Sequence, residues 1–166
     1  MITRIKHSYQ TYIDEFLKDI FVQCPNCCRQ AIVRSKGDLY KLATHEPVKF
    51  TCLNCGSNKI LRHSRSVLYS ARPRVAPGEY ILIGAAVDPF FHLPLWLATR
   101  CGDETLWAYN SKHLAFIRLH VEAKLRERNG IEPNNRSLGS RLPAWITSRR
   151  NRSLILRTIE SLERKK

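Results

Sequence analysis

The chain has 166 residues and a hydrophobic fraction of 43%, which excludes wholesale disorder and suits one domain or two small ones. Its 28 lysines and arginines outnumber 14 acidic residues, for a formal net charge of +14. Such a charge favours an anionic partner, most commonly nucleic acid, although it also serves solubility alone. No stretch reaches the roughly 18 apolar residues of a membrane span, so no membrane partner is expected.

The N-terminal segment is predicted to begin with a helix. Ser8 is a suitable N-cap, and the apolar residues after it recur at helical spacing. We expect an amphipathic helix over residues 8–21 that packs against the rest of the chain. Its apolar residues are Tyr9, Tyr12, Ile13, Phe16, Leu17 and Ile20.

Residues 22–65 carry two C-x-x-C pairs, Cys24-Pro-Asn-Cys27 and Cys52-Leu-Asn-Cys55. Between them, residues 31–34 and 39–42 flank a turn signal and predict a hairpin. Residues 48–51 are strand-like and lead into the second pair. Two such pairs around a hairpin predict a zinc ribbon.

Four thiolates at this spacing can form a tetrahedron around one Zn²⁺, with Zn–S bonds of about 2.3 Å. The expected ligands are Cys24, Cys27, Cys52 and Cys55. The gap of 24 residues between the pairs exceeds the usual ~15–20, but an extended hairpin accommodates it. A closed four-cysteine shell indicates structural rather than catalytic zinc. Cys28 could replace Cys27, but the spacing favours Cys27 and leaves Cys28 as a small buried residue.

The cysteine spacing also helps to predict whether the protein resides in a reducing or an oxidising compartment. A redox C-x-x-C usually stands alone near a βαβ pattern, and neither condition holds here. Residues 1–6 are polar and basic, and no apolar run of signal-peptide length follows them. Metal-type cysteine spacing without such a signal leads us to expect a cytoplasmic protein.

The second half is predicted to be a small α/β segment with a helical, basic C-terminus, after a linker at residues 66–79. The complete expectation is an α+β fold with two domains, residues 1–70 (helix and ribbon) and 71–166. The predicted strands are residues 80–87, 95–98 and 105–109, with a turn at 101–103. The predicted helices are residues 112–128 (capped by Asn110 or Ser111), 137–142, 143–149 and a last one that Asn151 or Ser153 caps.

The sequence does not predict an active site. Asp88, His92 and Glu104 form the one acidic and histidine cluster to test, but the lysine of a nuclease Glu-x-Lys is missing. Cys101 with His92 or His113 could form a nucleophile pair, yet a lone free cysteine is more often inert core. Phosphate-binding glycine motifs are absent. We therefore expect a protein that is not an enzyme.

The C-terminal 36 residues are the most basic part of the chain, with nine basic and three acidic residues, a difference of +6. Arginine forks match phosphate oxygens, so these side chains are the candidate nucleic-acid contacts. A solvated helix face is the alternative, and a helix-turn-helix over residues 137–164 is a further interpretation. The candidate residues are Arg136, Arg141, Arg149, Arg150, Arg152 and Arg157.

Three later stretches accompany the cysteine pairs: residues 88–97 (Asp-Pro-Phe-Phe-His-Leu-Pro-Leu-Trp-Leu), 106–110 (Leu-Trp-Ala-Tyr-Asn) and 137–145 (Ser-Leu-Gly-Ser-Arg-Leu-Pro-Ala-Trp). The cysteine arrangement resembles transcription-factor-type zinc ribbons. The later stretches are similar to small bacterial zinc-ribbon proteins of unassigned function, a likeness over most of residues 20–165. The resemblance implies zinc binding and little more, because such ribbons serve nucleic-acid binding and protein docking alike.

Two functions remain open at this point. The first is a non-catalytic protein that binds DNA or RNA through its basic surface. The second is a protein-interaction module, such as an adaptor or an inhibitory, immunity-type partner of an acidic protein. Its anchor would be the aromatic residues Phe90, Phe91, Trp96 and Trp107, since aromatic side chains dominate binding hot spots. The same residues also suit a core.

Overall fold

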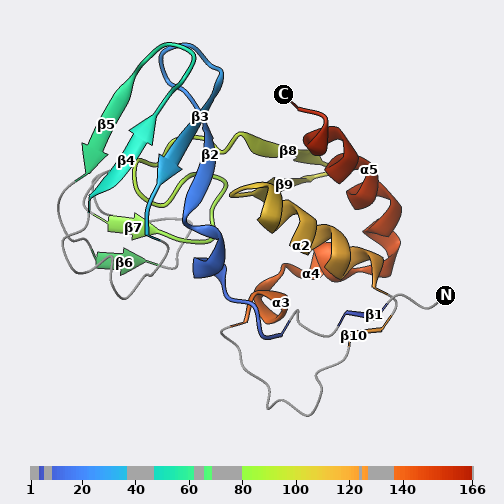
Figure 1. Ribbon diagram of the computed structural model, residues 1–166. Coiled ribbons are helices and arrows are strands. Elements are labelled where there is room, and N and C mark those ends of the chain that lie inside the picture. Colours follow the sequence, from blue (N-terminus) through green and yellow to red (C-terminus); the bar gives the residue numbers. More distant parts are fainter. Residues whose placement is uncertain are drawn as a thin grey trace.

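The computed structural model describes residues 4–5, 9–36, 47–61, 66–68, 80–123, 125–126 and 137–165. Over these residues the chain combines helices with mainly antiparallel sheets, so the predicted α+β class is confirmed. In Figure 1 a four-stranded sheet stands on one side, and a β-hairpin with two longer helices stands on the other. No helix in the described part of the chain is long and apolar enough to cross a membrane.

The four-stranded antiparallel sheet has the strand order β2-β3-β4-β5. The loop between β2 and β3 and the loop between β4 and β5 lie at the same end of this sheet (Figure 1). The strands are β2 (Asp19–Gln23), β3 (Gln30–Arg34), β4 (Val48–Thr51) and β5 (Asn58–Leu61). The sequence predicts two of these strands, β3 and β4, and the third predicted strand, at residues 39–42, lies outside the described residues.

The predicted helix over residues 8–21 is wrong. Of the described residues 9–21, only Ile13–Phe16 are helical, as the short 3-10 helix η1, and the chain then enters β2. Ile20 and Val22 are fully buried while Gln23 is exposed, which is the two-residue alternation of a strand. Five register pairs with β3 outweigh the local helical spacing, because tertiary pairing overrides weak propensity.

Two short parallel pairs lie outside this sheet (Figure 1). Beside it, β6 (Ser66–Leu68) pairs with β7 (Tyr80–Leu82), and on the side of the helices β1 (Arg4–Ile5) pairs with β10 (Leu125–Arg126). The predicted linker at 66–79 thus contains a strand at its start. The predicted strand over 80–87 ends early, because Gly84 at φ +93° takes a left-handed conformation that turns the chain.

The β-hairpin at residues 97–108 and the start of the helix after it lie where the turn and capping residues predict them. β8 (Leu97–Cys101) and β9 (Glu104–Ala108) are antiparallel, with Gly102 in the turn at φ +65°. Asn110 caps α2 (Ser111–Glu122), since its side chain accepts a hydrogen bond from the His113 backbone N–H. α2 ends six residues earlier than predicted, and the chain forms β10 shortly afterwards.

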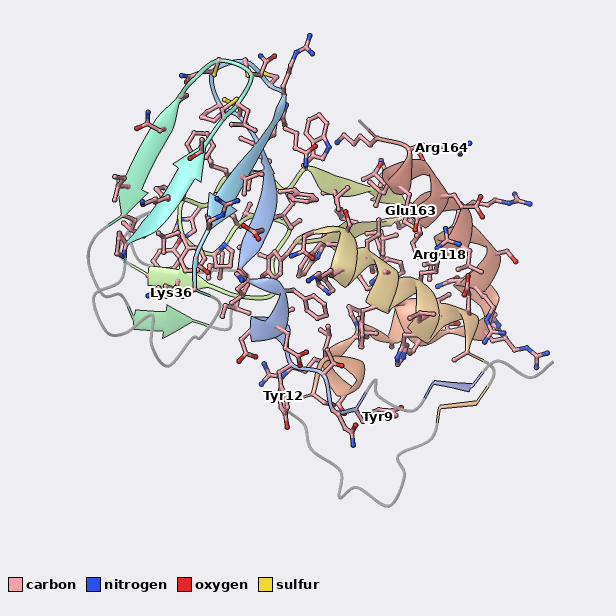
Figure 2. The ribbon with its side chains drawn as sticks, viewed as in Figure 1. Tyr9, Tyr12, Lys36, Arg118, Glu163 and Arg164 are labelled. Atoms are coloured by element: carbon pink, nitrogen blue, oxygen red, sulfur yellow. The ribbon has the colours of Figure 1, made fainter. Side chains whose placement is uncertain are left out.

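The C-terminal segment contains α3 (Leu138–Arg141), α4 (Ala144–Thr147), the 3-10 turn η2 (Arg149–Asn151) and α5 (Arg152–Glu163). α3 and α4 have four residues each, so residues 137–165 do not form a helix-turn-helix. α5 packs on α2 and β8. At its end, Glu163 accepts two hydrogen bonds from Arg118 of α2, at 2.7 and 3.1 Å (Figure 2).

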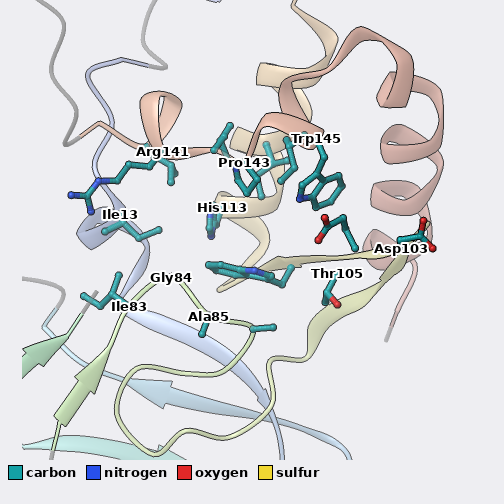
Figure 3. Close-up of a pocket in the computed structure, with 17 residues that line it drawn as sticks. Ile13, Ile83, Gly84, Ala85, Asp103, Thr105, His113, Arg141, Pro143 and Trp145 are labelled. Atoms are coloured by element: carbon teal, nitrogen blue, oxygen red, sulfur yellow. The ribbon is translucent and has the colours of Figure 1, made fainter. Parts of the chain in front are cut away.

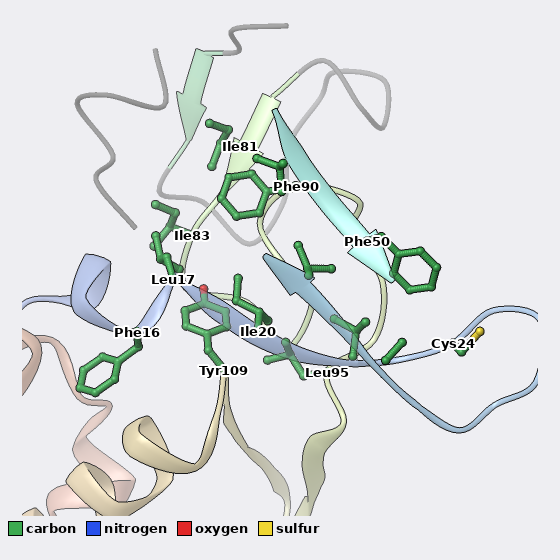
Figure 4. Close-up of a cluster of buried hydrophobic side chains, with 14 of the residues drawn as sticks. Phe16, Leu17, Ile20, Cys24, Phe50, Ile81, Ile83, Phe90, Leu95 and Tyr109 are labelled. Carbon is green, nitrogen blue, oxygen red and sulfur yellow. The ribbon is translucent and has the colours of Figure 1, made fainter. Parts of the chain in front are cut away.

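Two hydrophobic clusters hold the fold together. The first joins β2, β3 and β4 to the segment after β7 and to Tyr109 (Figure 4). The second joins the hairpin β8–β9 to α2, α4 and α5. The first cluster draws residues from both sides of position 70, and the predicted two-domain division stays a prediction. Phe90 is buried, and Phe91, Trp96 and Trp107 are half-buried against the clusters, as their core interpretation predicted.

Asp88 organises the turn that leads into the first cluster. Its fully buried carboxylate accepts backbone N–H bonds from Phe90 and Phe91 at 2.9 Å and from Leu93 at 2.6 Å. Burial raises the pKa of this carboxyl, although the three N–H donors act in the opposite direction. The carboxylate therefore satisfies three backbone donors that would otherwise be buried without partners.

Replacing Asp88 with alanine is expected to destabilise the protein by at least about 2 kcal/mol, because it leaves buried donors unsatisfied. Urea denaturation followed by circular dichroism measures the change. Asp103→Ala serves as the control, since Asp103 is exposed at the hairpin turn and should change stability by less than about 0.5 kcal/mol. Equal effects of the two substitutions would contradict the assigned role of Asp88.

Candidate metal centre

The two C-x-x-C pairs occupy two loops with the same backbone pattern. In the first loop the Cys28 N–H donates to Cys24 O at 2.9 Å, and in the second the Gly56 N–H donates to Cys52 O at 3.0 Å. A second bond repeats as well, from the N–H of the first cysteine to the carbonyl five residues later, at 2.8 Å in both loops. Each loop thus presents its two cysteines in the same way.

The four predicted cysteines come together. Their Sγ atoms all lie within 4.8 Å of one another, and we call this set (Cys24, Cys27, Cys52 and Cys55) the cysteine cluster. Across the loops, Cys24 and Cys55 are 3.7 Å apart and Cys27 and Cys52 are 3.6 Å apart. A tetrahedral ion with bonds of about 2.3 Å to sulfur requires edges of about 3.8 Å, whereas a disulfide requires about 2.05 Å. The geometry therefore fits one metal ion and not a pair of disulfides.

The cluster is buried on one side and reaches the surface on the other. Cys24 and Cys52 are fully buried, Cys27 is half-buried and Cys55 is exposed. A further bond links the loops, because the Asn26 side chain donates to Ser57 Oγ at 3.2 Å. This placement suits an ion that joins the two loop ends of the sheet.

Two thiols of the cysteine cluster differ in pKa. A hydrogen bond from the Arg29 backbone lowers the pKa of Cys27 to about 6. A similar bond from the Ser57 backbone acts on Cys55, but desolvation and the three neighbouring thiols raise its pKa to about 12. Four negative sulfurs at these distances repel one another, so their joint ionisation requires a bound cation.

Cys28 does not belong to the cluster. It is exposed, which corrects the prediction that it would be buried. Its φ of +57° matches the +72° of Gly56, the equivalent position of the other loop. A signal for this was present in the sequence, because the residue after each second cysteine closes the tight turn, and glycine there is the residue that left-handed backbone favours.

The predicted acidic and histidine candidates have other partners. Asp88 holds backbone N–H groups, as described above, and the His92 ring stacks on Tyr80 with centroids 4.6 Å apart. Glu104 is exposed on β9. Cys101 is buried at the end of β8, where its sulfur accepts a hydrogen bond from the Thr158 hydroxyl at 3.4 Å.

The candidate arginines are distributed along the C-terminal segment. Arg149, Arg150 and Arg157 are exposed. Arg152 is half-buried, and its guanidinium donates to Ala123 O, the C-cap of α2, at 3.1 Å. Arg141 is exposed on α3. Arg136 lies outside the described residues.

Comparison of the chain with protein-family models, with curated proteins and with solved structures gave no match.

Substituting Cys55 with alanine is expected to abolish stoichiometric metal binding, because three thiolates leave one position open to water. The matched control is Cys28→Ala, since both cysteines are exposed and their truncation costs similarly little packing. Metal content after gel filtration, measured by elemental mass spectrometry, should fall only in the Cys55 variant. A parallel loss in the Cys28 variant would contradict the ligand assignment.

His113 is a buried histidine whose importance the sequence did not show. It is 2% exposed, and burial lowers its pKa from 6.5 to about 3. As the pH falls below about 6.5, the unfolded chain gains a proton that the folded protein resists. Stability from this group is complete above 6.5 and is lost progressively as the pH falls towards 3.

This loss should amount to at most about 1.4 kcal/mol per pH unit. His113→Asn is expected to show a shallower decline in unfolding free energy between pH 7 and pH 5 than the parent protein. Comparing the two slopes removes contributions from carboxylates and cysteines that both proteins share. Identical slopes would show that His113 titrates normally.

Proposed function

We propose that the cysteine cluster holds one structural Zn²⁺ and that this part of the chain is a zinc ribbon. Four sulfur donors in a tetrahedral arrangement are the preferred shell of structural zinc. Such a shell leaves no position for substrate or water, which supports a non-catalytic role. Thiolate ligands that must stay reduced favour the cytoplasm.

We further propose that the protein binds nucleic acid through the start of α5. The observation that carries this proposal is that two exposed arginines, Arg149 and Arg150, immediately precede the N-terminus of a 12-residue helix. That first turn has no acidic residue, and the Asn151 side chain donates to Trp145 O instead of capping it. The Arg152 N–H already donates to Arg149 O, so the attraction rests on the guanidinium groups and on the positive end of the helix, which together favour a phosphate.

The other candidate arginines contribute unequally to this surface. Arg157 lies further along α5 and is exposed, so it suits a second phosphate contact. Arg152 has a backbone partner on α2, so its first role is structural. The contacts proposed here are to phosphate, and they select neither DNA over RNA nor one base sequence.

The test is a double charge reversal, Arg149→Glu with Arg150→Glu. Affinity for labelled duplex DNA and single-stranded RNA, measured by fluorescence anisotropy, should fall at least tenfold. The log–log salt slope on duplex DNA should become shallower by about 2, for two lost phosphate contacts.

The matched control reverses Lys49 and Lys59, two exposed lysines on strands β4 and β5. It changes the net charge by the same amount and should weaken binding about threefold or less, because screened charges act over a short range. Equal losses in the two variants would mean that net charge alone attracts nucleic acid. Absence of binding at low salt would overturn the proposal.

A protein-docking role is the second candidate, and one observation favours it. Leu53, in the second cysteine loop, is 86% exposed, and an aliphatic side chain at a metal-rigidified loop is a suitable anchor for a partner. The partner would be acidic, given the net charge of +14. The aromatic anchor first considered for this role is instead packed against the clusters.

A further inference from the structure

A cavity of about 740 Å³ lies between the loop after β7, the hairpin strand β9 and the helices α2, α3 and α4 (Figure 3). Its walls are mainly apolar and include Ile13, Ile83, Trp107 and Trp145. Volumes between about 300 and 1,000 Å³ with such walls are typical of small-molecule sites. The cavity lies apart from the cysteine cluster and does not include Arg149 or Arg150.

One polar group in the cavity lining is buried without a partner. The backbone N–H of Tyr109 donates to Nδ1 of His113 at 3.3 Å, so Nδ1 carries no proton. In a neutral ring the proton therefore sits on Nε2. Nε2 is buried and has no hydrogen-bond partner among the described residues.

The His113 ring cannot easily turn towards another partner. Phe16 stacks on it with centroids 4.9 Å apart, and Trp107 meets it edge-on at 5.7 Å. Figure 3 shows His113 between Ile13 and Trp145, facing the loop with Gly84 and Ala85. A fixed, buried donor left without an acceptor destabilises the unliganded protein, and a ligand with an acceptor would recover this loss.

Charged residues lie at the edge of the cavity. Asp103 and Glu104 belong to the hairpin side and Arg141 to the α3 side, and all three are exposed. The polar end of a ligand would therefore meet solvent and mixed charge, while its other end would meet His113.

We propose that this cavity binds a small molecule with an aromatic or apolar body and a hydrogen-bond acceptor, such as a carbonyl oxygen, at its buried end. The body packs against Ile83, Trp107 and Trp145. The acceptor receives a hydrogen bond from His113 Nε2–H after a small shift of the side chains that cover this buried nitrogen. This site is independent of the metal ion and of nucleic-acid binding.

The test compares acetophenone with α-methylstyrene, which replaces the carbonyl oxygen with a methylene group of similar shape. Both are titrated into the full-length, metal-loaded protein and followed by NMR, including the ¹⁵N resonances of the His113 ring. Acetophenone should bind at least about fivefold more tightly, as one recovered hydrogen bond implies, and should shift the Nε2 resonance.

Two variants test whether the probes bind in this cavity and whether His113 causes the difference between their affinities. His113→Asn keeps an acceptor near the position of Nδ1 but removes the Nε2 donor, so the two probes should bind equally. Ala85→Phe fills the cavity from the opposite loop without touching His113 and should weaken both probes at least tenfold.

If the His113 variant does not fold, the ratio of the two affinities in the parent protein, together with the Ala85 variant, still decides the question. Equal affinities in the parent protein, no binding of either probe, or a Nε2–H that contacts a bound water and does not respond to acetophenone would each overturn the proposal.

Discussion

The approach of four cysteine sulfurs at one end of the four-stranded sheet is the interaction on which the fold around β2–β5 depends. Cys24 and Cys27 close the loop between β2 and β3, and Cys52 and Cys55 close the loop between β4 and β5. β5 contributes little buried apolar surface, since three of its four residues are exposed. Without a cation between the loops, the four sulfurs cannot all be ionised, because their charges would repel one another where the two loops meet. A metal ion held by the four sulfurs would therefore contribute folding free energy directly.

A second set of contacts, made by the Asn110 side chain, joins this sheet to the helical part of the protein. The Asn110 side chain donates to Phe16 O at 2.9 Å and to Asp19 O at 2.8 Å, and its oxygen caps α2. One side chain thus ties the start of β2 to the start of α2. Further along the chain, Asp88 fixes the turn that packs on the same sheet. These contacts fix the sheet that carries the cysteines against α2, on which α5 packs in turn.

The parts of this arrangement that local rules govern could be predicted from the sequence. Cysteine spacing predicted the cluster, Asn110 predicted the start of α2, and Gly102 predicted the hairpin turn. The helix over residues 8–21 could not be judged locally, because Ile13, Phe16 and Ile20 suit a helix as well as a turn followed by a strand. Pairing with residues 30–34, which lie outside the segment whose spacing suggested a helix, decided the outcome. The sequence offered His113 only as a possible partner of Cys101. Its buried environment arises from Tyr109, Phe16 and Trp107, which only the fold brings around it.

The central claim is that four cysteine sulfurs hold one zinc ion. The most direct measurement is the X-ray absorption spectrum at the zinc edge of the purified protein, together with its zinc content. The account predicts one zinc per chain with four sulfur neighbours at about 2.3 Å. Nitrogen or oxygen neighbours in place of any sulfur, or a protein that folds fully without metal, would contradict it.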